Sequence, residues 1–182
     1  IVVLVIAVGQ SFASIPQLFA QPTYYGQFTD SAGIAPGDKV RIAGRAGYRA
    51  IEPWNDEIDA YLRDGGTLAE LRRAIDDAGL DVVSMIALHS WVTTEGPAYQ
   101  QALDECRRRM DQAVALGSPY IVASPPQEVV DLGHAARRFG ELVEIGRRLG
   151  AEPSMEFLGF VAGIKHGAGA WTLARDCGAP HA

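Results

Sequence analysis

From about residue 48 onward, the chain alternates between two hydrophobic patterns. Segments with apolar residues at helical spacing end at a glycine, and each is followed by a short, mostly apolar segment typical of a β-strand. Helices are expected at 68–78, 99–116, 134–149 and 170–177, and strands at 48–54, 81–88, 119–124 and 153–158. The first of these helices is expected to begin with a capping box formed by Thr67 and Glu70.

Strands that alternate with helices predict right-handed βαβ units and a parallel sheet. Four strands do not close an eight-stranded barrel, which takes about 250 residues. From the residues alone, a small open sheet of flavodoxin type is the structural alternative. In both folds, the groups that act on substrates lie at the carboxyl ends of the strands.

The first part of the chain has a different pattern. Residues 1–8 (IVVLVIAV) are wholly apolar, and they fit the end of a transmembrane helix, the end of a signal peptide or a buried strand. Residues 15–46 are rich in turn formers. Within them, APGD (35–38) predicts a turn, and the alternating sequence DKVRIA (38–43) predicts a half-buried strand.

Charge excludes one class of function. The net charge is −6, whereas a nucleic-acid-binding surface is normally basic, so no nucleic-acid partner is expected. Cys106 and Cys177 form no CxxC motif, which fits a reduced, cytosolic setting for the acidic part of the chain.

Glu156 is the strongest candidate for a functional side chain. It lies near the end of an apolar strand, where a carboxylate is costly to bury unless it is paired or bound to a metal. A catalytic or metal-ligating role and a structural salt bridge are the two interpretations. Glu52 has the same position at the end of the first strand, with the same alternatives.

Three further side chains follow strand ends. His89 is a candidate for substrate binding, although a lone histidine there also fits a structural role. Trp54 and Trp91 are candidates for stacking on a sugar ring, or for packing at the rim of the site. The run RRR (107–109) is expected to be a solvated helix face.

From about residue 45, the chain resembles the sugar phosphate isomerase/epimerase family, whose fold is the xylose-isomerase-like TIM barrel. The resemblance rests on an ordered set of segments: GYRAIEPW, TLAELRRAIDDAGLDVVSMIAL, ALDECRRRMDQAVALGSPYIVASPP and RRLGAEPSMEFLGFVAGI. It implies an α/β fold that is a partial (β/α)8 TIM barrel of about four βα units. It also implies isomerase or epimerase chemistry on a sugar or sugar phosphate, with a divalent metal (Mn, Mg, Zn or Co) held by two Glu, an Asp and a His.

Glu156 matches the first metal-ligating Glu of that family, and it is the residue expected to be both catalytic and metal-binding. Glu52, Trp54, His89 and Trp91 are the expected substrate-binding residues. The family's remaining ligands match positions beyond Ala182, so the chain as given is expected to bind metal weakly and to be inactive.

Before about Gly44, the chain resembles the Mce (mammalian cell entry) family of envelope lipid transporters. IVVLVIAVGQSF resembles the end of their membrane anchor, and PTYYGQFTDSAGIAPGDKVRIAG resembles the opening of their β-domain. The resemblance implies a chimeric chain with a seam at about 43–46. It also implies the alternative function, a membrane-anchored protein of lipid transport or substrate binding.

Three domains follow from the two resemblances: a truncated membrane-anchor helix at 1–14, a fragment of an Mce-type β-domain at 15–44, and an incomplete TIM barrel at 45–182. The expected partner is a small sugar or sugar phosphate, with membrane association through residues 1–14. The expected location is cytoplasmic for the isomerase-like part, or the membrane or cell envelope if the anchor is genuine. The oligomeric state is not predicted.

Overall fold

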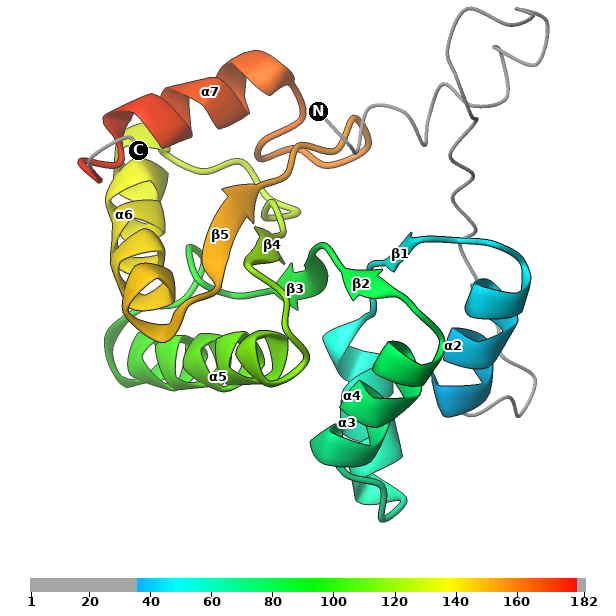
Figure 1. The fold of residues 1–182 in the computed structure, drawn as a ribbon. Helices are drawn as coiled ribbons and strands as arrows, with labels where there is room; N and C mark the ends of the chain where they lie inside the picture. Colours follow the sequence, from blue (N-terminus) through cyan, green and yellow to red (C-terminus); the bar gives the residue numbers. More distant parts are fainter. Residues whose placement is uncertain (1–35, 180–182) are drawn as a thin grey trace, which may run out of the picture.

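The computed structural model describes residues 36–179 of the chain, as helices packed around short parallel strands (Figure 1). The elements in chain order are α2 (Pro36–Arg45), β1 (Ala50–Ile51), α3 (Asn55–Arg63), α4 (Leu68–Asp77), β2 (Asp81–Val82), β3 (Met85–Leu88), α5 (Gly96–Ala115), β4 (Tyr120–Ala123), α6 (Leu132–Leu149), β5 (Glu152–Met155) and α7 (Gly167–Asp176).

The strands form one parallel series in chain order. β1 pairs with β2, while β3 pairs with β4 and β4 with β5, all parallel. A parallel bridge between Trp54, which follows β1, and Ile86, on β3, joins the β1–β2 pair to the β3–β4–β5 sheet. β2 and β3 are therefore two parts of the single strand that the sequence predicts at 81–88.

This order distinguishes the two predicted folds. A flavodoxin-type sheet has the strand order 2-1-3-4-5, in which the chain reverses direction across the sheet. In this chain each strand lies beside the one before it, as in a (β/α)8 barrel, so the predicted partial TIM barrel is confirmed.

The helices cover one side of the strands and bury its apolar side chains. Met85 and Ile121 are register partners on β3 and β4, and both are fully buried in the main core. Figure 1 shows α5, α6 and α7 grouped around β3–β5, and α2, α3 and α4 grouped beside β1 and β2. The neighbouring pair Ile86 and Val122 faces the other side, where both residues line a cavity.

Most of the predicted helices are present, with shifted ends. The predicted capping box is confirmed: the Thr67 hydroxyl accepts from the Glu70 amide, and the Glu70 carboxylate accepts from the Thr67 amide at 2.9 Å. The helix at Asn55–Arg63 (α3) was not predicted. Its residues NDEIDAYLR place few apolar side chains at helical spacing, and Ile58 is the one buried apolar side chain.

The predicted strand at 38–43 is wrong, because Pro36–Arg45 is the helix α2. The alternation in DKVRIA also places Val40 and Ala43 three residues apart, on one helix face, and both are buried. A proline at the first helical position favours this start.

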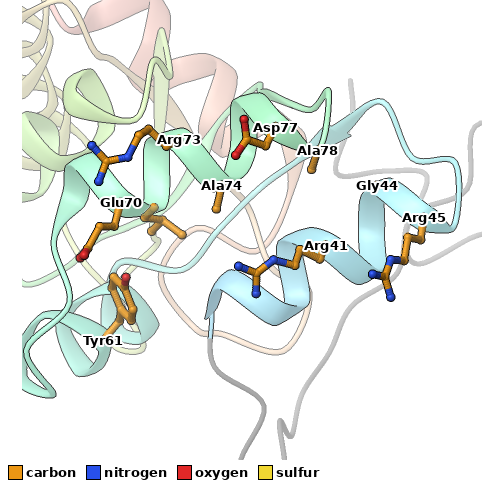
Figure 2. Close-up of a pocket in the computed structure, with 10 residues that line it drawn as sticks. Arg41, Gly44, Arg45, Tyr61, Glu70, Arg73, Ala74, Asp77 and Ala78 are labelled. Carbon is orange, nitrogen blue, oxygen red and sulfur yellow. The ribbon is translucent and has the colours of Figure 1, made fainter.

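Close packing between α2 and α4 holds this helix in place. A Cβ atom on Gly44 would lie 2.8 Å from the Ala78 carbonyl oxygen, so only glycine fits there without a shift (Figure 2). Residues 36–45 are thus helical, and the predicted seam at 43–46 falls in and just after this packed helix. The predicted anchor at 1–14 and the β-segment at 15–35 lie outside the described residues. Among residues 36–179, no helix is both long and apolar enough to cross a membrane.

Candidate functional site

A cavity of about 900 Å³ opens at the carboxyl ends of the strands. Each of the four parallel segments contributes a polar side chain to its lining: Glu52 after β1, His89 after β3, Ser124 after β4 and Glu156 after β5. The parallel arrangement brings these four strand ends to one edge of the sheet. The predicted site residues Glu52, Trp54, His89, Trp91 and Glu156 all line this one cavity.

Glu156 follows directly on β5. Its backbone amide donates to the Ala123 carbonyl at 3.3 Å, which fixes the residue beside the end of β4. The side chain is half-buried, and this burial raises the pKa of Glu156 above its ordinary value. Among the described residues it forms no ion pair within 4.0 Å, so the structural salt bridge considered from the sequence is not present.

Glu52 stands on the opposite edge of the strand series, also half-buried. Burial raises the pKa of Glu52, and the nearby Ser84 hydroxyl partly offsets this rise. The Ser84 Oγ atom is buried and makes no hydrogen bond of standard geometry within the described residues. The Ser84 hydroxyl therefore lies near the Glu52 carboxylate without a regular hydrogen bond to it.

The two carboxylates interact electrostatically. The negative charge of Glu52 is the second cause, after burial, of the raised pKa of Glu156. Burial raises the pKa of both carboxyl groups, and ionisation of one disfavours ionisation of the other, so the two titrate as a coupled pair. An ionised and a protonated carboxyl group in one cavity can act as a base and an acid.

His89 is biased toward its neutral form. Partial desolvation, and then the positive charge of Arg109, lower the pKa of His89, while Asp56 opposes this effect. Arg109 is 12% exposed at its side chain and donates to the Ala87 carbonyl at 2.9 Å, to Asp56 at 2.7 Å and to Glu105 at 2.8 Å. The prediction that the RRR run is a solvated face is thus wrong for Arg109, because this guanidinium reaches inward to the end of β3.

The two candidate tryptophans occupy different environments. Trp54 is 40% exposed at the cavity rim and is free to contact a ligand. Trp91 is 1% exposed; its Nε1–H donates to the Ser124 carbonyl at 2.9 Å and its ring packs on Phe139 with centroids 6.0 Å apart. Trp91 therefore has a packing role in the structure, and substrate contact through Trp91 stays a prediction.

Sequence reasoning missed two features of the cavity wall. Phe160 lines the cavity and is 81% exposed, which makes it a second aromatic ring at the rim; the signal was an aromatic residue soon after a strand end. Lys39 and Glu57 form an ion pair at 2.6 Å and also line the cavity. This pair joins α2 to α3, and no sequence pattern connects the two residues.

A second cavity, of about 730 Å³, lies between α2 and α4 (Figure 2). Its charged lining residues, Arg41, Arg45, Glu70, Arg73 and Asp77, are exposed on helix surfaces. It contains none of the strand-end residues, and the Glu70 carboxylate already caps α4. The strand-end cavity is therefore the candidate site.

The described residues do not form a metal centre by themselves. Among residues 36–179, no three side chains of His, Cys, Asp or Glu converge closely enough to hold an ion. Two carboxylates alone do not fit the ligand number of a tight divalent site. The metal-ligand role of Glu156 stays a prediction.

Comparison with known proteins supports the fold. A family model described as "Xylose isomerase-like TIM barrel" matches residues 40–181, which is most of the chain. The match covers all four strands and the predicted site residues Glu52, Trp54, His89, Trp91 and Glu156. No curated protein matches the chain, and these comparisons give no support to the Mce resemblance.

Several solved structures share the fold at low sequence identity. A xylose isomerase domain-containing protein from Salmonella typhimurium is 19% identical with a TM-score of 0.72, over 81% of this chain and 54% of that one. The IolI protein with a bound zinc atom is 19% identical with a TM-score of 0.68, over 76% and 53% of the two chains. D-psicose 3-epimerase in the presence of D-fructose is 19% identical with a TM-score of 0.64, over 80% and 55%. The chain thus spans about half the length of each of these three structures.

Proposed function

Because the chain belongs to the xylose isomerase-like TIM barrel family, we propose that its strand-end cavity is a sugar site of the isomerase and epimerase type. The observation that carries this proposal is the pair of half-buried, electrostatically coupled carboxyl groups, Glu52 and Glu156, that line one cavity. Isomerisation and epimerisation of sugars move a proton at a carbon next to a carbonyl group, which requires a base and an acid held close together.

Two of the site residues transfer protons, and two others bind the sugar. Glu52 and Glu156 supply the base and the acid: one carboxylate accepts a proton from the sugar, and the other carboxyl group donates one. Neutral His89 offers a hydrogen bond to a sugar hydroxyl, and exposed Trp54 offers an apolar face to the C–H side of the ring.

The number of metal ligands limits the activity that the described residues can support. The similar structures include one with bound zinc, and a divalent metal would supply the Lewis acid that polarises the carbonyl group. Since the described residues bring two carboxylates together and not a full ligand set, residues 36–179 alone would bind a metal weakly and turn over substrate slowly. The cytoplasmic location stays a prediction of the family resemblance.

The test is a titration of the full chain with D-fructose, followed by amide chemical shifts in NMR spectra. Shifts are expected at Glu52, His89, Ser124 and Glu156, and they weaken in Glu156→Gln. Glu144→Gln is the matched control, because Glu144 is an exposed partner of Arg148 on α6, away from the cavity.

Two outcomes contradict the proposal. If no strand-end amide shifts at saturating D-fructose, the sugar site is refuted. If calorimetry with MnCl₂ shows tight stoichiometric binding and the loaded protein epimerises D-fructose, the stated limit on activity is refuted.

A further inference from the structure

One extra residue interrupts the parallel ladder beside Glu52. Val82 is the register partner of Ile51, and Ile86 is the bridge partner of Trp54. The step from Ile51 to Trp54 is three residues, whereas the step from Val82 to Ile86 is four. The second strand therefore carries a β-bulge between β2 and β3, and a bulge turns side chains away from the directions that regular pairing gives them.

The side chains around the bulge point in the directions that this extra residue imposes. Val82 and Met85 are both buried in the main core, although side chains three residues apart in a regular strand point to opposite faces. Ile86, the next residue, lines the strand-end cavity. Ser84 lies two residues before Ile86 and therefore points to the same side of the strand, toward Glu52.

The Ser84 hydroxyl is a buried donor without a regular partner. Its Oγ atom makes no hydrogen bond of standard geometry within residues 36–179, and Ser84 does not itself line the cavity. A buried hydroxyl without a partner disfavours folding, so it calls for an explanation, and a functional contact is one. The Glu52 carboxylate is the group that can complete the contact, because the Ser84 hydroxyl lowers the pKa of Glu52 against the larger effect of burial.

We propose that Ser84 is a positioning residue, whose hydroxyl donates to the Glu52 carboxylate and holds it toward the cavity as the base of the carboxyl pair. The inference rests on the proposed function, since it assigns the two roles within that pair. A hydroxyl donor favours the ionised form of a carboxyl group. The Glu156 carboxyl group accepts no hydrogen bond from residues 36–179, so no donor favours its ionised form in the same way.

In this assignment Ser84 transfers no proton. The proton of the sugar C–H bond moves to the Glu52 carboxylate, and the electron pair of that bond moves toward the carbonyl oxygen, to which Glu156 donates a proton. The Ser84 O–H bond stays intact throughout. Ser84 acts through Glu52 alone, which is why its effect is sought at the carboxyl group of Glu52.

Carboxyl carbon-13 NMR of the full chain as a function of pH tests this role. Ser84→Ala removes the donor and keeps the burial, so the pKa of Glu52 is expected to rise further above its ordinary value of 4.5. Ser84→Thr keeps a hydroxyl at the same position and is expected to bring the pKa of Glu52 back toward that of the unaltered protein. Glu52→Gln identifies the Glu52 signal by its loss.

Ser118→Ala is the matched control. Ser118 is also buried, but its hydroxyl donates to the Tyr120 carbonyl at 2.8 Å, before β4 and away from the cavity. This variant loses a buried hydroxyl and is expected to leave the pKa of Glu52 unchanged. Every variant of Ser84 and Ser118 keeps the other titratable side chains that line the cavity: Lys39, Glu57, His89, Glu128 and Glu156.

Urea unfolding separates this role from a purely structural one. Because the Ser84 Oγ atom has no regular partner, Ser84→Ala is expected to unfold at the same urea concentration as the unaltered protein. An unchanged pKa of Glu52 in Ser84→Ala, with or without a loss of stability, overturns the proposal, and so does an equal rise in Ser118→Ala. If the pKa of Glu52 rises in Ser84→Ala but no strand-end amide of the unaltered protein responds to D-fructose, the contact stands, while the proposed function and the catalytic role of this contact are refuted.

Discussion

Glu52 and Glu156 lie on the first and the last strand of the described series, yet the charge of one raises the pKa of the other. In a flat parallel sheet, strands lie about 4.8 Å apart, so the two outer strands of four would be separated by roughly 14 Å. Curvature toward a barrel turns both strand ends into one cavity and shortens this separation. The electrostatic coupling is thus a consequence of the fold.

Glu52→Gln is expected to lower the pKa of Glu156. The substitution removes the negative charge and leaves the burial, so the pKa of Glu156 falls but stays above its ordinary value of 4.5. Carbon-13 NMR of the carboxyl groups as a function of pH measures it. Glu144→Gln serves as the control, and an unchanged pKa of Glu156 in Glu52→Gln would show that the two groups do not interact.

Stability is expected to depend on pH through Glu156. A carboxyl group whose pKa is higher in the folded state favours folding below its unfolded pKa, and this contribution is lost as pH rises through the folded pKa. The free energy of unfolding of Glu156→Gln, relative to the unaltered protein, should therefore increase from about pH 4 to about pH 8. Urea unfolding at several pH values measures this difference.

Asp59 offers a control for that experiment. Hydrogen bonding from Arg108 is the main reason that the pKa of Asp59 lies below its ordinary value of 3.8. Asp59 is therefore ionised throughout the range from about pH 5 to about pH 8. Asp59→Asn should change the free energy of unfolding by a nearly constant amount across this range. A difference for Glu156→Gln that is equally flat would contradict the prediction.

The two candidate tryptophans, Trp54 and Trp91, should differ in their effect on stability. Trp91→Phe removes the donor to the Ser124 carbonyl and shrinks a fully buried ring, and we expect a loss of about 2 kcal/mol. Trp54→Phe changes an exposed ring, and we expect a change within about 0.5 kcal/mol. Thermal or urea unfolding of both variants measures this, and equal losses would show that the burial of Trp91 has no energetic weight.

Gly44→Ala should weaken the contact between α2 and α4. The new Cβ atom would meet the Ala78 carbonyl oxygen at 2.8 Å, so we expect a loss of about 1 to 2 kcal/mol. Gly169→Ala, on α7, is the matched control: its Cβ atom would meet only Ile164 at an ordinary 3.6 Å, and alanine favours a helix by up to about 1 kcal/mol. Urea unfolding that gives both variants the same sign would refute the close packing at Gly44.

The sequence predicts the strands and their polar ends better than the helix layer. The glycine stops and apolar strands locate Glu52, His89 and Glu156, because parallel topology alone carries these residues to one edge. The helix α2 was mistaken for a strand because the six residues DKVRIA fit both the alternation of a strand and the spacing of a helix. The packing of Gly44 against Ala78 favours the helix, and this contact cannot be read from the local sequence. The coupling of Arg109 to His89 depends on contacts across α3 and α5, which no local pattern encodes.

Arg109 is bound by carboxylates of α3 and α5 and holds the Ala87 carbonyl, two residues before His89. The acidic side chains that fix this guanidinium, Asp56 and Glu105, are themselves exposed at the surface, to 62% and 44%. Changes on the outer helical surface are therefore not independent of the geometry at the ligand-facing end of β3. Substitutions made on that surface to improve solubility would therefore also change the position of the His89 imidazole in the cavity.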